Sequence, residues 1–355
     1  MAYFRLLMKN VLVDMHFLRL NPADELYSFA GDLGMAMGTR RPPDMMLHFY
    51  VPEKSVNVFG NDVQYEKQKE IDKYFKFSTG KFNVWHATTT VTPYQPFNKK
   101  TKFVFTIHDF NFMGEEDRSQ LQKMRWLRLV QERVKRADYI TFISDHARLE
   151  AYKYLDLGDK QSTVIYNGCN VPSKSNITAP LFEKPFLFSY GFFKPEKKFH
   201  LLPHLLGGND YNLIIGGNNE TPYKQAVIDA AAKAGVAERV HLAGVLAEEE
   251  KAWYYEKCDA FLLPSVVESF PTPAIEAMHF GKPVFLSMFS CLPEIGGDAV
   301  YYFESFDDAS MKKTFEEGMQ LYRETSPVEK VKERAAFFNW GDTALQYFDI
   351  YRELF

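Results

Sequence analysis

Two glutamates, Glu268 and Glu276, stand with seven residues between them in the stretch ESFPTPAIE. Carboxylates accept hydrogen bonds from hydroxyl groups, so a pair of them suits a polyhydroxylated ligand such as a sugar. Thr272 lies between them and is expected to cap a helix whose first position is Pro273. Because a helix N-terminus offers free N–H groups, the same stretch predicts a site for an anion such as a phosphate.

The elements that must position these glutamates are predicted to be strand, loop, helix and strand. The apolar runs 260–263 and 284–286 suit buried parallel strands, and Gly281 and Pro283 end the helix between them. In such a unit, ligands bind beyond the carboxyl ends of the strands, where the loop with Glu268 lies. The stretch therefore describes a pocket for a sugar nucleotide; the alternative is a surface acid beside a helix acid that merely favours the dipole.

Short apolar runs recur along the whole chain and alternate with helical segments. Six precede the proline-rich stretch 172–185 and six follow it, which predicts two parallel α/β sheets of about equal size joined by a linker. The expected strands are 10–15, 45–51, 84–87, 103–107, 139–143, 164–166, 186–190, 213–215, 240–242, 260–263, 284–286 and 300–303. The expected helices include 23–37, 62–77, 118–137, 147–155, 226–234, 248–257, 310–324 and 341–355. The predicted domains are 1–175, joined by helix 341–355, and 176–340.

Composition narrows the class of protein. The 355 residues are 46% hydrophobic and 25% charged, as in soluble globular proteins, and are long enough for two domains. A net charge of −4 gives no argument for nucleic-acid binding. Three scattered cysteines, no signal peptide and no long apolar stretch favour a reducing, cytoplasmic location without a membrane span. No Asp-x-Asp occurs, so a metal-clamped diphosphate lacks obvious ligands and no metal is expected.

The stretch ESFPTPAIEAM followed by GKPV resembles the signature of retaining glycosyltransferases of family four. The resemblance implies the GT-B fold: two Rossmann-like parallel-sheet domains face a central cleft, and a C-terminal helix crosses back to the N-terminal domain. It also implies transfer of a sugar from a nucleotide diphosphate sugar to a glycan or glycolipid acceptor, in polysaccharide or lipopolysaccharide synthesis, with no cofactor. Ser269 and Pro271 stand where the family usually has glycines.

The resemblance assigns donor contacts to the second half of the chain. The stretch GFFKPEKK is similar to the family's phosphate motif and places Lys197, helped by Lys194, on the diphosphate. Glu276 would hold the ribose diol and Glu268 the sugar hydroxyls, with amides near Thr272 assisting the phosphates. The remaining expected donor contacts are Gly191, Gly216, Gly244, Val245 and Phe270.

In the first half, His108 follows the apolar run FVFTI and turns toward the ligand edge. From position alone a structural role is the alternative, but TIHD resembles the family motif whose histidine approaches the donor sugar. His108 is thus expected to be catalytic with Glu268 and Lys197, and His86 is a weaker candidate. Asp109 is expected to orient His108 or cap the next segment, and Ser144 to cap a helix.

Two features of the first half depart from a simple assignment. The family's glycine-rich loop after the first strand is absent, because LRLNPADELYSFA holds no glycine before Gly31. Either backbone contacts from 21–24 replace it or that contribution to phosphate binding is missing. Helix 120–136 is basic and carries Trp126. Its favoured interpretation is a solvated face whose Met124, Leu127 and Val134 pack on the sheet, and the alternative is peripheral contact with anionic lipid.

Two other functions stay open from sequence. A sugar-nucleotide epimerase on the same architecture would change its substrate with no acceptor present. A non-catalytic module for sugar nucleotides or glycans would bind the donor without turnover, which the missing glycine loop motivates. The base, the sugar and the acceptor are not encoded in any recognisable motif.

Overall fold

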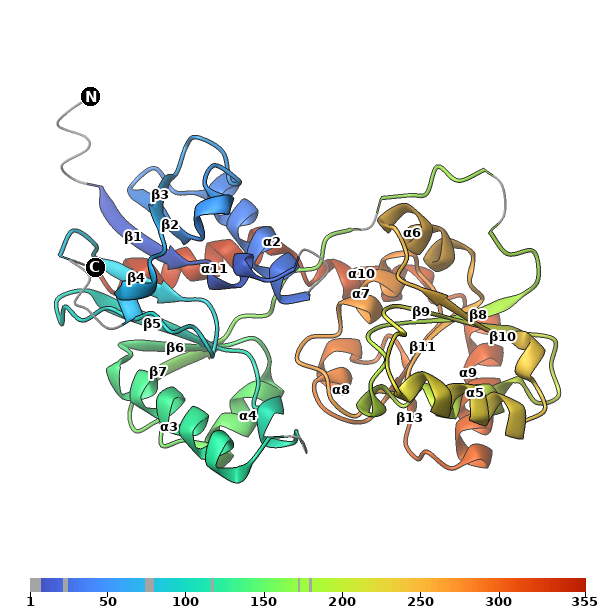
Figure 1. Cartoon of the computed structure of the whole chain (residues 1–355). Helices are drawn as coiled ribbons and strands as arrows, with labels where there is room; N and C mark the ends of the chain where they lie inside the picture. Colours follow the sequence, from blue (N-terminus) through green and yellow to red (C-terminus); the bar gives the residue numbers. More distant parts are fainter. Residues whose placement is uncertain (1–7, 22–24, 74–79, 116–117, 172, 179–180) are drawn as a thin grey trace. The chain divides into compact units, whose positions relative to one another are not determined.

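The computed structural model describes residues 8–21, 25–73, 80–115, 118–171, 173–178 and 181–355 (Figure 1). Contacts divide the chain into two compact units. Unit 1 contains Met1–Gly168 and Asn339–Phe355, and unit 2 contains Cys169–Phe338. The sequence analysis placed these boundaries after 175 and 340, and the contacts place them after 168 and 338.

Unit 1 is built on a seven-stranded sheet, sheet A, with strand order β3-β2-β1-β4-β5-β6-β7 and every pair parallel. The strands are β1 (Lys9–Asp14), β2 (Met45–Val51), β3 (Gln64–Lys67), β4 (Val84–Ala87), β5 (Lys102–Ile107), β6 (Tyr139–Phe142) and β7 (Gln161–Val164). The inner strands β1, β4 and β5 are buried over most or all of their length, which is why continuous apolar runs predicted them.

Helices cover both faces of sheet A (Figure 1). Along β1 the side chains alternate: Val11 and Val13 join the core with α2 (Glu25–Arg40) and α11 (Trp340–Glu353), whereas Leu12 joins the opposite core with α3 (Gln120–Arg136) and α4 (Asp145–Tyr154). The expected packing of the C-terminal helix on the first domain is therefore confirmed.

A buried histidine ties α11 to sheet A. His86 in β4 is fully buried, with Nδ1 2.6 Å from the Tyr351 hydroxyl of α11 and Nε2 2.7 Å from the Thr106 hydroxyl of β5. Burial lowers the pKa of His86 to about 3, so its ring is neutral at pH 7. Since both ring nitrogens have protein partners, the structure gives His86 a structural role.

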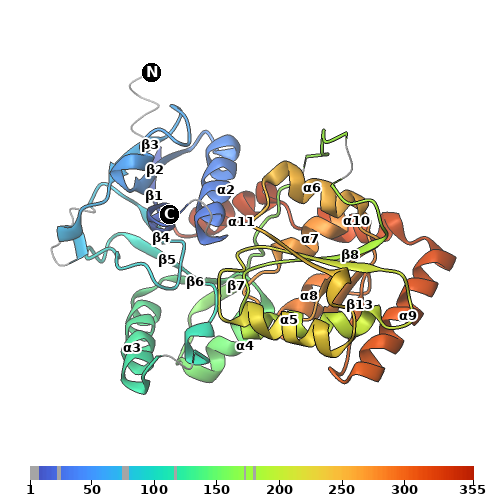
Figure 2. The same cartoon turned by 45° about the vertical axis from the view of Figure 1, so that its right-hand side comes forward.

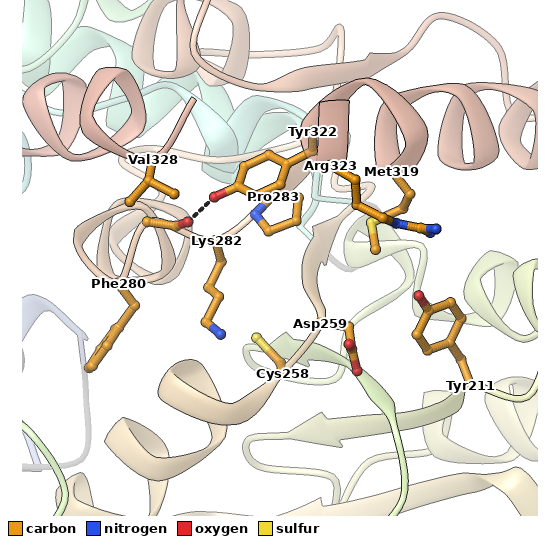
Figure 3. Close-up of a pocket in the computed structure, with 11 residues that line it drawn as sticks. Tyr211, Cys258, Asp259, Phe280, Lys282, Pro283, Met319, Tyr322, Arg323 and Val328 are labelled. Carbon is orange, nitrogen blue, oxygen red and sulfur yellow. Dashed lines mark hydrogen bonds between the residues drawn. The ribbon is translucent and has the colours of Figure 1, made fainter. Parts of the chain in front are cut away.

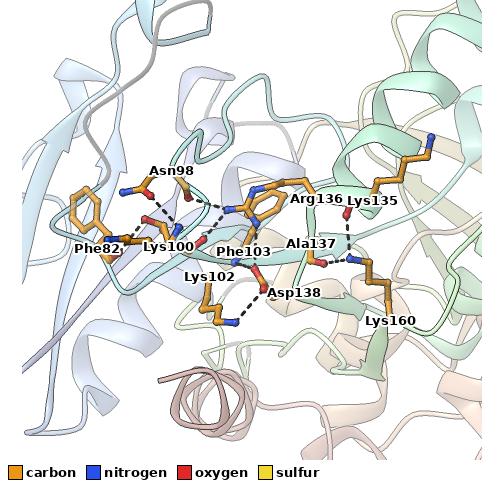
Figure 4. A network of polar contacts seen from close by, with 11 residues as sticks. Phe82, Asn98, Lys100, Lys102, Phe103, Lys135, Arg136, Ala137, Asp138 and Lys160 are labelled. Atoms are coloured by element: carbon orange, nitrogen blue, oxygen red, sulfur yellow. Dashed lines mark hydrogen bonds and ion pairs between the residues drawn. The ribbon is translucent and has the colours of Figure 1, made fainter.

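A polar network fastens the C-terminal end of α3 to the amino edge of sheet A (Figure 4). Arg136 donates to the carbonyl oxygens of Asn98 and Thr101 at 3.1 and 2.7 Å. Lys160 donates to the carbonyl oxygens of Lys135 and Ala137, which end the helix. These two cations therefore donate hydrogen bonds to carbonyl oxygens at the end of the helix and in the loop before β5. The hydrogen bonds fix the C-terminal end of α3.

Unit 2 contains a six-stranded parallel sheet, sheet B, in the order β10-β9-β8-β11-β12-β13. Its strands are β8 (Phe186–Tyr190), β9 (Asn212–Gly216), β10 (Val240–Gly244), β11 (Ala260–Leu263), β12 (Val284–Ser287) and β13 (Tyr301–Phe303). Figures 1 and 2 show α6 (Glu248–Lys257), α7 (Thr272–His279) and α10 (Val328–Ala336) over one face, and α5 (Tyr223–Lys233) and α9 (Asp308–Thr325) over the other. A 3-10 segment, η6 (Phe199–Leu206), packs against α5 and α9.

Some expected elements were wrong or missing. The helix expected at 62–77 is instead strand β3 and the 3-10 turn η3 (Glu70–Lys73), and residues 74–77 lie outside the described part. The short helix α8 (Leu292–Gly296), α10 and η6 were not predicted. In the part of the chain that the structure describes, no helix is both long enough and apolar enough to cross a membrane.

Candidate functional site

The strand order of sheet B fixes where a ligand site belongs. From β8 the chain proceeds first to β9 and β10 on one side and then to β11, β12 and β13 on the other. The connections therefore reverse direction between β8 and β11, and ligands of open α/β sheets bind beyond the carboxyl ends of the strands at such a point. Lys197 follows β8 and Glu268 follows β11, so the predicted residues flank this position.

Lys197 and Glu268 form a buried ion pair. The Lys197 Nζ lies 2.7 Å from Glu268 Oε1, and the two side chains are only 11% and 6% exposed. The main chain holds the two loops together, because the Val266 N–H donates to the Glu196 carbonyl oxygen at 2.8 Å. The sequence predicted both residues at the site but did not predict that they bond to each other.

The backbone of Glu268 is fixed by the loop after β12. The Ser290 hydroxyl donates to the Glu268 carbonyl oxygen at 2.6 Å and lies 3.1 Å from the Glu268 nitrogen, whose N–H it accepts. The Cys291 Sγ lies 3.3 Å from the same carbonyl oxygen. These contacts hold the carboxylate in place before any ligand arrives, which is what a binding residue needs.

Glu276 belongs to a second buried ion pair. Its Oε1 lies 3.0 Å from Lys251 Nζ of α6, and both side chains are 11% exposed. Lys251 also contacts the exposed Glu248 at 3.1 Å, and its Nζ lies 5.6 Å from the centre of the Tyr190 ring at the end of β8. Lys251 was not predicted, and it is the main addition that the structure makes to this site.

Burial and the Lys251 charge act in opposite directions on Glu276. Burial raises the pKa of Glu276 above its ordinary 4.5, and the charge of Lys251 is the largest opposing influence. For Lys251, burial lowers the pKa, but the Glu276 and Glu248 carboxylates outweigh it and raise the pKa overall. Such paired, perturbed groups beyond strand ends are typical of functional sites.

The N-terminus of α7 differs from the prediction. Thr272 does not cap the helix: Pro271 occupies the cap position and makes no side-chain cap bond. The Thr272 N–H donates to the Phe270 carbonyl oxygen, those of Ala274 and Ile275 donate to the Pro271 carbonyl oxygen, and Pro273 has no N–H. The N–H groups of Thr272, Ala274 and Ile275 thus already have main-chain acceptors.

Glycines let the loops after β8, β9 and β10 approach one another. Gly217 has a φ of 117°, and a Cβ there would lie 2.0 Å from the Gly191 carbonyl oxygen, so no other residue fits. Its N–H donates to the Gly244 carbonyl oxygen at 2.7 Å. A Cβ on Gly191 would lie 3.7 Å from Lys197 Nζ, which places that ammonium beside the strand end.

The remaining predicted donor contacts lie around these loops in unit 2. Gly244 has a φ of 73° with open space where a Cβ would point, and Val245 after it is 67% exposed. Gly216 instead makes room for the rings and methyls of its neighbours, so its lack of a side chain has a packing reason. Lys194 is exposed beside Phe192, and the half-buried Phe270 packs edge-on against Phe338.

His108 lies in unit 1, at the carboxyl end of β5, and is buried. Its Nε2 lies 2.8 Å from the Thr88 carbonyl oxygen, so Nε2 carries the proton in this contact, and Nδ1 is the nitrogen left for other chemistry. The Phe29 ring packs edge-on against it at 4.6 Å. Burial lowers its pKa, although the Thr88 contact and Asp109 oppose this.

Three other sequence predictions concern unit 1. Asp109 caps the following turn by accepting from the Asn111 N–H at 3.0 Å, and Ser144 caps α4 through Ala147, as expected. The segment after β1 forms a 3-10 turn, η1 (His16–Arg19), that buries two apolar side chains. Of the residues expected to replace the glycine loop, 22–24 lie outside the described part.

A cavity of about 470 Å³ lies in unit 2 away from these residues (Figure 3). Its lining comes from the amino ends of β9, β11 and β12 and from α9, and it includes Tyr211, Asp259, Lys282 and Arg323. The ion pairs lie beyond the carboxyl ends, at the opposite edge of sheet B. The cavity is therefore separate from the candidate site.

Known proteins resemble this chain at the level of sequence. Residues 173–335 match the family model of glycosyl transferases group 1. The O-antigen chain mannosyltransferase RfbU of Salmonella typhimurium is 25% identical over 218 residues, which are 61% of this chain and 60% of RfbU. The serotype-specific mannosyltransferase WbdA of Escherichia coli is 23% identical over 232 residues, 59% of this chain and 28% of WbdA. The chain thus spans less than two thirds of either relative.

Solved structures resemble both units together. Sucrose-phosphate synthase from Thermosynechococcus elongatus matches with a TM-score of 0.73 at 16% identity, covering 98% of this chain and 99% of that one. Anabaena Alr3699/HepE in complex with UDP-glucose matches with a TM-score of 0.68 at 13% identity, covering 97% and 99%. This likeness shows the predicted GT-B fold of two Rossmann-like parallel-sheet domains. Residues 173–335, slightly less than half of the chain, are thus similar in sequence to the glycosyl transferases group 1.

Proposed function

We propose that this protein is a retaining glycosyltransferase that moves a sugar from a nucleotide diphosphate sugar to an acceptor hydroxyl. The observation that carries the proposal is the pair of buried lysine–glutamate contacts beyond β8 and β11, at 2.7 and 3.0 Å. Hydroxyl-accepting carboxylates beside buried cations match a ligand with both a sugar and a diphosphate.

Each charged residue receives a role in the donor complex. Lys197, helped by the exposed Lys194, stabilises the diphosphate as it departs, which is the electrostatic part of catalysis. Glu268 holds the hydroxyls of the transferred sugar, and Glu276 holds the ribose diol. Backbone at Gly244 and Val245 borders the base. His108 supports the reacting sugar through Nδ1, since its Nε2 is bonded to Thr88.

The relatives narrow the sugar and the biological setting that we propose. RfbU and WbdA are named mannosyltransferases, and RfbU is an O-antigen chain enzyme. A mannose-bearing donor is therefore the first to test, with a glycan or glycolipid of cell-surface polysaccharide or lipopolysaccharide synthesis as acceptor. UDP-linked donors come next, because Alr3699/HepE is seen with UDP-glucose.

The test is a panel of nucleoside diphosphates and sugar nucleotides in a thermal-shift assay, because a ligand that binds the folded state raises its melting temperature. The best donor is then incubated with and without acceptor glycans. A transferase releases nucleoside diphosphate and forms product only with acceptor. Change of the sugar nucleotide without acceptor would indicate an epimerase, and binding without turnover would indicate a non-catalytic module.

We further propose that catalysis needs no metal or other cofactor and takes place in the cytoplasm. The lysines supply positive charge to the diphosphate, so activity is expected to survive EDTA; a loss that magnesium restores would refute this.

All three cysteines are buried thiols outside any disulfide, and burial raises the pKa of Cys258 to about 12. Inert buried thiols suit a reducing compartment.

The exposed face of α3 supports peripheral contact with the inner face of a membrane. Contrary to expectation, Met124 does not pack on the sheet: it is 66% exposed, and Leu121 and Leu129 are also exposed. Arg125 and Arg128 share that face and would attract anionic lipid.

Vesicles with and without anionic phospholipid test this contact. The substitution Met124→Glu is expected to reduce vesicle binding, whereas Leu321→Glu, at an exposed site of unit 2, is expected to leave it unchanged. Equal binding by both variants and the wild type would remove the membrane from the proposal.

A further inference from the structure

Lys251 is a buried cation on a helix whose other charges face solvent. It lies in α6, whose sequence EEEKAWYYEK begins with three acidic residues, yet only 9% of Lys251 is exposed. Its Nζ reaches Glu276 Oε1 of α7 at 3.0 Å and Glu248 at 3.1 Å. Taking an ammonium group out of water costs several kcal/mol, so its attraction to the Glu276 carboxylate must offset most of that cost.

We propose that Lys251 is a positioning residue for the donor nucleoside, which holds the Glu276 carboxylate ionised and oriented to accept the hydrogen bonds of the ribose diol. This inference rests on the proposed function of Glu276. Lys251 bonds to Oε1 at 3.0 Å, and this contact restrains the Glu276 side chain against α6. The Tyr190 ring, 5.6 Å from the Lys251 Nζ, joins this arrangement to the end of β8.

The charge of Lys251 affects the protonation of Glu276 more than any other neighbouring group does. Burial raises the pKa of Glu276, and the Lys251 charge is the largest influence that lowers it. The other titratable groups near it are Tyr255, whose pKa is raised by burial and by Glu276, and Glu248, whose negative charge raises the pKa of Glu276. Without Lys251, the carboxyl group takes up a proton at higher pH. A protonated acid is a weaker acceptor for the diol.

A purely structural brace between α6 and α7 is the competing explanation, and pH separates the two. If Lys251 acts through the charge of Glu276, its removal weakens nucleotide binding most at low pH, and raising the pH restores part of the affinity. A brace would lower affinity equally at every pH. The conservative Lys251→Arg keeps the positive charge and is expected to retain most of the affinity.

The experiment is calorimetric titration with the nucleoside diphosphate that the wild type binds best, from about pH 6 to about pH 8.5. Lys251→Met is expected to weaken binding roughly ten- to a hundredfold near pH 7 and less at the upper limit. Lys257→Met is the matched control, because Lys257 lies on the same helix with its side chain 50% exposed. In a Glu276→Gln background, Lys251→Met should add little further loss.

The results are separable from those of the proposed function. A wild type that binds no nucleoside diphosphate overturns both proposals. The positioning role alone is overturned if the wild type binds normally and Lys251→Met binds with unchanged affinity, or with a loss of affinity that does not depend on pH. It is also overturned if Lys251→Met causes an equal loss of affinity in the Glu276→Gln background. If Lys251→Met does not fold, the affinities of Lys251→Arg, of Glu276→Gln and of the double variant Lys251→Met, Glu276→Gln still test the role of the charge.

Discussion

The ion pair between Lys197 and Glu268 makes a prediction in which stability and activity separate. Consider Lys197→Met, Glu268→Gln and the double variant. The two charges lie 2.7 Å apart with side chains 11% and 6% exposed. Each single variant leaves one buried charge without its partner, whereas the double variant removes both charges and leaves side chains of similar length.

The expected magnitudes follow from that geometry. At 2.7 Å and an effective dielectric constant of about 20, the attraction is roughly 6 kcal/mol. Desolvation of the two ions costs several kcal/mol each, so the pair as a whole contributes little net free energy. Loss of one partner is expected to lower the free energy of unfolding by about 3–5 kcal/mol, and the double variant should lie within about 1–2 kcal/mol of the wild type.

Chemical denaturation measures the free energies of unfolding. Because a chain with two units need not unfold in one step, hydrogen exchange at β8 and β11 is needed to assign the change to unit 2. Donor turnover is measured on the same proteins. All three variants should lose turnover, including the double variant that regains stability. A double variant as unstable as the weaker single variant would refute the electrostatic reasoning, and one that regains turnover would remove both residues from the site.

Three further predictions concern groups outside the ion pairs. Burial raises the pKa of Asp14 to about 7, so the free energy of unfolding of the wild type should fall as pH rises from about 4 to about 7. The fall should be up to about 1.4 kcal/mol per pH unit. Denaturation across this pH range should show that Asp14→Asn removes the fall. Tyr351→Phe leaves Nδ1 of buried His86 without its partner and should cost about 1–3 kcal/mol by the same measurement. Gly217→Ala places a Cβ 2.0 Å from a carbonyl oxygen and should destabilise unit 2 more than Gly235→Ala, where φ is also positive but the space is open; equal melting temperatures would contradict this.

The strands were predictable because most of them are buried on both faces. Predicted and observed bounds coincide for 45–51, 84–87, 186–190 and 260–263, where apolar runs have clear ends. The exceptions are the two edge strands of sheet A, which are polar: β3 (QYEK) was not predicted, and β7 (QSTV) was expected at 164–166 but lies at 161–164. An edge strand buries little and so lacks the pattern that identified the others.

Helix ends were less predictable where proline or tertiary contacts decide them. The 3-10 segment η6 contains Pro203, and α8 has Pro293 in its first turn, so neither shows an uninterrupted helical period. At α7, Thr272 looked like a cap, but Pro271 ahead of it takes that position. Which residue caps a helix depends on the backbone angles before it, and the sequence does not specify those.

The candidate site was predictable in its residue types but not in its pairing. Glu268, Glu276 and Lys197 follow from the motif and from strand ends. Lys251 was hidden, because a lysine after EEE on a helix normally belongs to a solvated face. A signal existed: Lys251 stands four residues before the buried Tyr255, on the stripe that faces the protein. A cation on the buried stripe of a helix predicts a buried acid on its neighbour.

This pairing bears on how the proposed diphosphate ligand would be attracted to the site. Lys197 was predicted as a diphosphate contact, but Glu268 already balances its charge in this structure. In the part of the chain that the structure describes, neither Lys194 nor Lys198 forms an ion pair within 4.0 Å, so these two lysines, offset in part by Glu196 between them, give the loop after β8 a positive charge. An arriving diphosphate would meet them first, and Lys197 would then divide its hydrogen bonds between the phosphate and Glu268. The carboxylate would thereby gain freedom to accept sugar hydroxyls only when a diphosphate is present, which makes the two contacts mutually dependent.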